Sequence, residues 1–151
     1  MGVTFSSWQT PFSDAKIEII DLCFGNGGVD SQIDEHGSFK KDAERSIGMS
    51  DLSVRVLVYE TREVCQLHYK DVFAFRVVDE GGLNEIWQAT SEQGGRPGET
   101  TFRVAGHTWS KENEFGFANV SEQGAFMLAT DWDCLEVLCI EPPEIKVLEK
   151  I

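Results

Sequence analysis

The stretch LSVRVLVYE, Leu52–Glu60, decides the fold class of this chain. Its β-branched residues recur at every second position, so that Val54, Val56 and Val58 share one face of an extended strand. The opposite face carries Arg55, Leu57 and Tyr59, a mixture of polar and apolar side chains that is typical of a strand with one buried side. A second run, Glu63–Tyr69, follows after a short step and alternates in the same way. The two runs together predict a β-hairpin.

Extended segments are expected on both sides of this hairpin. In the segment Lys16–Phe24, the slip in alternation between Ile19 and Ile20 predicts a β-bulge or a bend. The segment Cys134–Glu141 is apolar on both faces, so it is expected to be a central strand that is covered on both sides. The other segments expected to be extended are Lys16–Phe24, Val72–Val78, Leu83–Ala89, Thr100–Ala105, Phe115–Val120, Ala125–Thr130 and Glu144–Leu148.

No stretch predicts a long amphipathic helix. Residues 25–50 hold few large apolar side chains and many glycine, serine and charged residues, so they are expected to form a long polar loop with one helical turn at Lys41–Ile47. Residues 1–151 are therefore expected to be a single, mainly β domain. The predicted architecture is an antiparallel sandwich or a partly open barrel of about nine short strands with little helix.

The chain is strongly acidic. Its 151 residues include 26 Asp and Glu against 13 Lys and Arg, for a formal net charge of −13. This charge disfavours nucleic acid and anionic membranes as direct partners, because the average surface would repel both. No apolar run approaches the roughly 18 residues of a membrane-spanning helix, and the first residues lack the basic and apolar regions of a secretion signal. We therefore expect a cytoplasmic protein.

The cysteines and histidines give no metal site, and no motif indicates a cofactor. Cys134 and Cys139 are an odd number of positions apart, so a strand would send their thiols to opposite faces. The histidines are far apart in the sequence and none lies in a metal-binding motif. All the cysteines lie in apolar segments and are expected to be reduced and buried; they are Cys23, Cys65, Cys134 and Cys139.

The most unusual local motif is Asp131-Trp132-Asp133, which lies in an expected turn between two apolar strands. One interpretation is a solvated turn with a half-buried tryptophan. A second is a divalent-cation site, because alternate residues of an extended chain place their carboxylates on one side. A third is an interface, in which an aromatic anchor with acidic neighbours binds a basic partner.

Upstream of this motif, Trp109 is close in sequence to Glu112 and Glu114, which is a similar combination of aromatic and acidic residues. From Glu112 to Ile151 the chain carries nine acidic side chains, only two lysines and no arginine. Some of these carboxylates are expected at strand edges, where charge discourages edge pairing. The excess still favours a basic macromolecular partner. The residues predicted to bind it are Trp109, Glu112, Glu114, Asp131, Trp132 and Asp133.

The segment Ser13–Ile20, SDAKIEII, resembles the His-Asp-Ala-x-Ile opening of small bacterial β proteins grouped with polymorphic-toxin immunity proteins, with Ser13 in place of the histidine. In that group a paired run similar to Val54–Tyr59 is followed by an aromatic-x-x-Val segment, here Tyr69–Val72. A last strand then resembles Cys134–Leu138. The resemblance implies a protein that binds and neutralises a cognate toxin without catalysis.

Three functions remain open at this point, and the sequence does not indicate the oligomeric state. The first is a non-catalytic cytoplasmic binding protein, an immunity protein whose acidic face neutralises a basic toxin. The second is an enzyme that uses Asp131 and Asp133 with His107, for which no motif is present. The third, also without enzymatic activity, is a small β barrel that binds an apolar ligand between aromatic side chains, among them Phe73, Phe75, Phe102 and Phe126.

Overall fold

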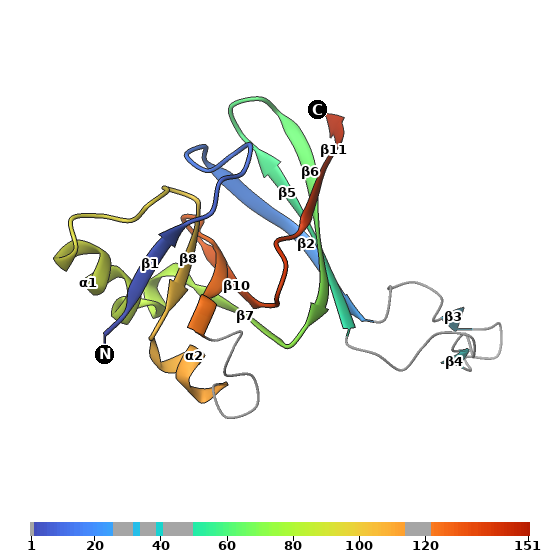
Figure 1. The fold of residues 1–151 in the computed structure, drawn as a ribbon. Helices are drawn as coiled ribbons and strands as arrows, with labels where there is room; N and C mark the ends of the chain where they lie inside the picture. The colour runs from blue at the N-terminus through green and yellow to red at the C-terminus, as the bar shows by residue number, and fades with distance from the viewer. Residues whose placement is uncertain (1, 26–31, 34–38, 41–49, 114–121) are drawn as a thin grey trace.

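The computed structural model describes residues 2–25, 32–33, 39–40, 50–113 and 122–151, and two antiparallel sheets dominate it (Figure 1). Sheet A contains, in spatial order, β1 (Thr4–Ser7), β8 (Thr101–Ala105), β9 (Ala125–Leu128), β10 (Asp133–Leu138) and β7 (Ala74–Asp79). Sheet B contains β11 (Glu144–Lys150), β6 (Glu63–Val72), β5 (Ser50–Val58) and β2 (Ile17–Gly25). A separate pair consists of β3 (Gln32–Ile33) and β4 (Phe39–Lys40).

The mainly β, antiparallel prediction is confirmed, and the two sheets do not close into a barrel. The expected hairpin is β5–β6, which pairs Val56 with Cys65, and its turn contains Arg62 at a φ of 63°. The expected bulge is also present, because the pairing of β2 with β5 shifts register between Ile19 and Asp21. Both features follow from a period of two that is readable in the sequence.

The main core lies between the two sheets. Alternate residues of β5 and β6 point inward, so that Val54, Val56 and Leu67 are each fully buried. Sheet A contributes Phe126 and Leu135 to the same cluster. Burying a side chain of this size stabilises the fold by about 1.5–3 kcal/mol, so this cluster accounts for much of the sandwich's stability.

A second core covers the other face of sheet A. Figure 1 shows α1 (Asn84–Glu92) and α2 (Thr108–Glu112) on the side of sheet A away from sheet B. Leu83 and Ile86 pack there against residues of β8, β9 and β10. As a result β10 is buried on both faces, as its apolar sequence predicted, although the strand ends at Leu138 rather than Glu141.

The expected strand Leu83–Ala89 is wrong, because this segment enters helix α1. Its buried side consists of Ile86, Ala89 and Thr90, at spacings of three and four, which is the period of a helix. A 3-10 turn, η1 (Glu80–Gly82), precedes it and is capped by Asp79, whose carboxylate accepts a hydrogen bond from the Gly81 amide (2.8 Å). Strand β1 and helix α2 were not expected from the sequence.

The remaining expectations have mixed outcomes. Cys65, Cys134 and Cys139 are buried, but Cys23 is exposed, because β2 is an edge strand and the outer face of sheet B has no covering layer among the described residues. The polar loop expected at 25–50 contains the short strands β3 and β4. The helical turn expected at Lys41–Ile47 and the strand expected at Phe115–Val120 lie outside the described residues.

Candidate functional site

The Asp131-Trp132-Asp133 motif occupies the turn between β9 and β10. The Thr130 hydroxyl fixes this turn, since it accepts a hydrogen bond from the Trp132 amide (3.0 Å) and donates one to the Asp133 carbonyl (2.7 Å). From outside the turn, the Glu80 amide donates to the Trp132 carbonyl (2.6 Å). With its backbone held in this way, Trp132 projects outward and is 54% exposed. About half of the Trp132 side chain is thus open to solvent, which is compatible with the solvated turn of the first interpretation and also leaves surface for a partner.

A lysine from another part of the chain lies against this motif. Lys16, just before β2, places its Nζ 2.7 Å from Asp131 Oδ2 and 5.7 Å from the centre of the Trp132 ring. The same ammonium is 5.9 Å from the centre of the Tyr59 ring. The Tyr59 hydroxyl donates to Glu18 Oε2 (2.6 Å), and this hydrogen bond raises the pKa of Tyr59. One carboxylate and two aromatic rings thus surround a single cation, which we call the ammonium site.

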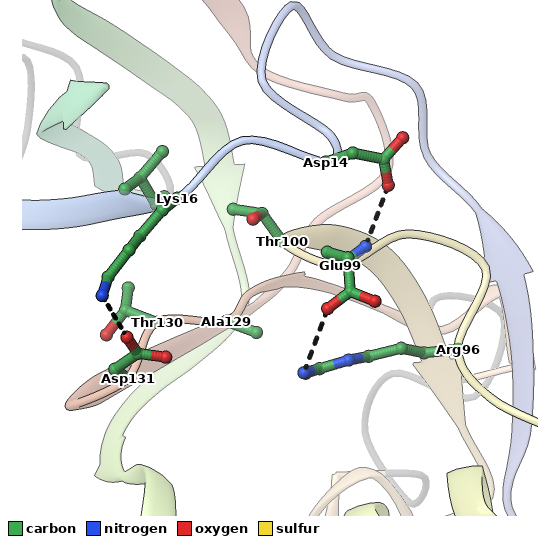
Figure 2. A pocket seen from close by; sticks show the side chains of 9 residues that line it. Asp14, Lys16, Arg96, Glu99, Thr100, Ala129, Thr130 and Asp131 are labelled. Atoms are coloured by element: carbon green, nitrogen blue, oxygen red, sulfur yellow. Dashed lines mark hydrogen bonds and ion pairs between the residues drawn. The ribbon is translucent and has the colours of Figure 1, made fainter. Parts of the chain in front are cut away.

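A surface hollow of about 200 Å³ adjoins the ammonium site (Figure 2). On its far side the Glu99 amide donates to Asp14 Oδ1 (3.2 Å), and Arg96 Nη2 lies 3.8 Å from Glu99 Oε2. A second hollow of about 260 Å³ shares Arg96, Thr130 and Asp131 with the first. We call the two hollows together the Asp131 groove.

The Asp131 groove is negative in charge, and one of its cations, Arg96, lies against two aromatic rings. The Arg96 guanidinium lies 4.8 Å from the centre of the Trp87 ring and 5.9 Å from that of Phe102, so its position depends on α1 and β8. Among the described residues, the cationic side chains that line the groove are Lys16 and Arg96. Its acidic lining residues are Asp14, Glu80, Glu99 and Asp131. Such a surface is suited to cationic groups.

The structure does not bring all the predicted partner-binding residues together. The Asp131 turn follows β9, whose last residue pairs with Thr101 at the start of β8, whereas Trp109 and Glu112 lie on α2, beyond the other end of β8. The length of β8 alone separates the two regions by about 13 Å. Trp109 is half-buried under the Arg76 guanidinium (5.0 Å to the ring centre). Asp133 is exposed at the start of β10, and Glu114 lies outside the described residues.

A buried polar cluster was missed by the sequence analysis, which counted Glu136 among the acids favouring a basic partner. Glu136 is in fact 1% exposed, in the middle of β10. Its Oε1 is 2.6 Å from Nε2 of the fully buried His107, and its Oε2 is bound by Arg76 Nε. The available signal was a single carboxylate within an apolar run, because a charge buried in that way needs partners.

This cluster also bears on the enzyme interpretation. His107 follows β8 and is therefore at the opposite end of that strand from Asp131. It pairs with Glu136 and not with the two carboxylates that the interpretation assigned to it. Within the described ranges no group of three or more His, Cys, Asp and Glu side chains is placed to bind a metal ion.

The aromatic residues suggested for a ligand-binding barrel do not share one cavity. Phe75 and Phe126 pack in the core between the sheets, whereas Phe73 and Phe102 pack on the helix-covered face of sheet A. In the part of the chain that the structure describes, no helix is long and apolar enough to cross a membrane. Comparison of the chain with protein-family models, with curated proteins and with solved structures finds no match.

Proposed function

We propose that this protein is a non-catalytic binding protein that captures a basic protein, as an immunity protein captures a basic toxin, and that the contact is made by Trp132 with the Asp131 groove. The observation that carries the proposal is the exposure of Trp132 between two exposed carboxylates. Exposed tryptophans that become buried on association are among the commonest energetic centres of protein interfaces. Blocking a toxin in this way requires no catalysis.

The ammonium site supports a cationic partner. Lys16 shows what a lysine of a bound protein would contact at Asp131 and Trp132, namely a carboxylate at 2.7 Å and a ring at 5.7 Å. The side chains of Lys16 and Asp131 are 59% and 64% exposed, so their ion pair is accessible to a competitor. An exposed pair of this kind is worth about 0–1 kcal/mol, and a partner that buries the site can replace it at little cost.

The overall charge supports rapid capture. A net charge of −13 attracts a basic protein over distances near the Debye length and raises its association rate. This attraction weakens as salt is added, whereas contacts with a buried Trp132 do not. The proposal therefore assigns the charges to the association rate and the tryptophan to the dissociation rate.

The decisive experiment purifies a basic protein captured by the immobilised chain and measures its binding kinetics at low and moderate salt; if no basic protein is captured, the proposal fails. Trp132→Ala is expected to speed dissociation by about thirtyfold, the effect of losing a central aromatic anchor. Asp131→Lys with Asp133→Lys is expected to slow association and flatten its salt dependence. The matched control, Glu122→Lys with Glu141→Lys, changes the net charge equally at two other exposed positions. Equal effects of the two pairs would contradict a specific role for the Asp131 turn.

A second measurement tests the ammonium site with a short lysine-rich peptide. Lys16→Met removes the internal cation and is expected to tighten peptide binding. Lys70→Met makes the same charge change at an exposed position of β6 and serves as the control. If both variants tighten binding equally, only net charge matters and the ammonium site does not hold the partner's cation.

A further inference from the structure

Strand β11 forms an outer edge of sheet B, with β6 as its one strand neighbour among the described residues (Figure 1). Three large apolar side chains are exposed on or directly after this strand: Val147 (57%), Leu148 (47%) and Ile151 (59%). An edge strand offers a row of backbone donors and acceptors to another strand. We propose that β11 pairs antiparallel with β11 of a second copy of the chain, so that two copies of sheet B form one continuous sheet.

The pairing with β6 establishes which way the β11 side chains point. Ile145 lies opposite Leu67 and Val147 opposite Cys65, and both of these β6 residues belong to the inter-sheet core. Lys146 lies opposite Gln66 and is therefore on the outer face. The register then shifts, so that Glu149 lies opposite Val64 and is also on the outer face. The extra residue in this bulge is Leu148.

The bulge makes one twofold register self-consistent. If Val147 faces Leu148 of the second copy, then Lys146 faces Glu149 of that copy, and both side chains lie on the outer face. In the same register Ile145 faces Lys150, and both lie on the inner face. A shift of one residue would set outer-face side chains against inner-face ones, which a regular sheet does not allow.

The central pairs of this register, Lys146 with Glu149 and Val147 with Leu148, are complementary in charge and in hydrophobicity, whereas Ile145 faces the charged Lys150. Twofold symmetry produces the Lys146–Glu149 pair twice and the contact between Val147 and Leu148 twice. Cross-strand neighbours are about 5 Å apart, close enough for ion pairing. The ion pairs found among the described residues include none formed by Lys146 or Glu149, although the charge of Glu149 also acts on Arg55 of β5. Neither side chain therefore gives up a close ion pair when it contacts a second copy.

Lysines and bulges on edge strands usually discourage pairing, because they present an unmatched charge to an incoming strand. On β11 the bulge lies at the centre of the register and each Lys146 meets a glutamate. The strand therefore rejects other edges and accepts its own copy. This pairing is independent of the Asp131 groove and would leave the dimer with two such grooves.

Charge reversal tests the pairing, with the dimer dissociation constant measured by analytical ultracentrifugation over a concentration series. Lys146→Glu and Glu149→Lys are each expected to weaken the dimer by about tenfold or more, because each turns two attractive pairs into repulsive ones. The double variant Lys146→Glu with Glu149→Lys is expected to restore wild-type affinity. Lys70→Glu, an equal charge change at an exposed position of β6, is expected to have no effect.

Hydrogen exchange gives a second readout that does not depend on the variants. Amides of residues 144–150 that point away from β6 are expected to exchange more slowly as protein concentration rises. Circular dichroism establishes that each variant is folded before its affinity is compared. A chain that is monomeric at every concentration would overturn the proposal. So would a dimer that neither single reversal weakens, or one that the double variant fails to restore.

Discussion

The outer face of each sheet carries an ion pair between a carboxylate and an arginine on neighbouring strands. The pair on sheet B is exposed to solvent, whereas the pair on sheet A is covered. On sheet B, Asp21 pairs with Arg55, and their side chains are 48% and 45% exposed. On sheet A, Glu136 pairs with Arg76, and their side chains are 1% and 27% exposed because α1 and α2 cover this face. The exposed pair can exchange its partner for water at little cost. The buried carboxylate cannot, so it connects β10, β7 and His107.

Thiol reactivity provides the largest expected contrast between the two faces. Cys23 lies on the outer face of sheet B and is exposed, whereas Cys134 lies on the covered face of sheet A, where burial raises its pKa to about 11. Burial likewise raises the pKa of Cys139 to about 12 and that of Cys65 above its ordinary value. Near neutral pH the thiolate fraction of Cys139 is therefore lower than that of an ordinary cysteine by about a thousandfold.

A time course with a thiol reagent, followed by mass spectrometry of the labelled peptides, checks this contrast. One cysteine, Cys23, is expected to react in the native protein and the other three only after denaturation. The Cys23→Ser variant should lack the fast phase altogether. Rapid native labelling of Cys134 would show that the helices do not seal the outer face of sheet A.

Removing each carboxylate tests the same contrast in stability. Glu136→Ala leaves a buried histidine and a half-buried arginine without their partner, and is expected to lower the free energy of unfolding by about 3–5 kcal/mol. Asp21→Ala removes the exposed counterpart and is expected to cost no more than about 1 kcal/mol. Urea denaturation of the two variants beside the wild type measures both values. Similar losses for the two would mean that the covering layer does not distinguish the pairs.

The difference between the faces also explains which parts of the fold were predictable. In sheet B the outer face is solvated, so β5 and β6 alternate in sequence, and the hairpin and the bulge near Ile19 could be located. In β9 and β10 of sheet A both faces are covered, so the alternation is lost. Leu83–Ala89 resembled a buried strand although Ile86, Ala89 and Thr90 have helical spacing. The burial of Glu136 depends on helices that its local sequence does not specify.

Only the part of the candidate site that lies within one short stretch of sequence was predictable. Asp131, Trp132 and Asp133 are consecutive, and their turn could be located from the strands on either side. Lys16 and Arg96 reach the same surface from segments far away in the chain. The positions of Lys16 and Arg96 depend on how the start of β2 and the chain between α1 and β8 are placed relative to sheet A. No short sequence pattern specifies this placement. Trp109, grouped with Trp132 on composition, lies beyond the other end of β8.

The smallest expected effect is the pH dependence of the stability that the exposed Asp21–Arg55 pair contributes. The hydrogen bond from Arg55 lowers the pKa of Asp21 in the folded protein. A carboxyl whose pKa is lower folded than unfolded stabilises the fold above its unfolded pKa, which is about 3.9. That contribution is lost as the pH falls through the folded pKa, when the carboxyl becomes protonated in both states.

Urea denaturation of Asp21→Asn and wild type at neutral and strongly acidic pH measures this contribution. At neutral pH the variant is expected to be less stable by no more than about 1 kcal/mol, because solvent screens a pair that is nearly half exposed. At a pH below the folded pKa the two proteins should be equally stable, since Asp21 is then neutral in both states. The variant Arg55→Gln should show the same loss at neutral pH and the same convergence in acid. A difference in stability that persists in acid would mean that Asp21 acts through a contact other than its charge. The exposed pair on sheet B would then behave more like the covered pair on sheet A than its exposure implies.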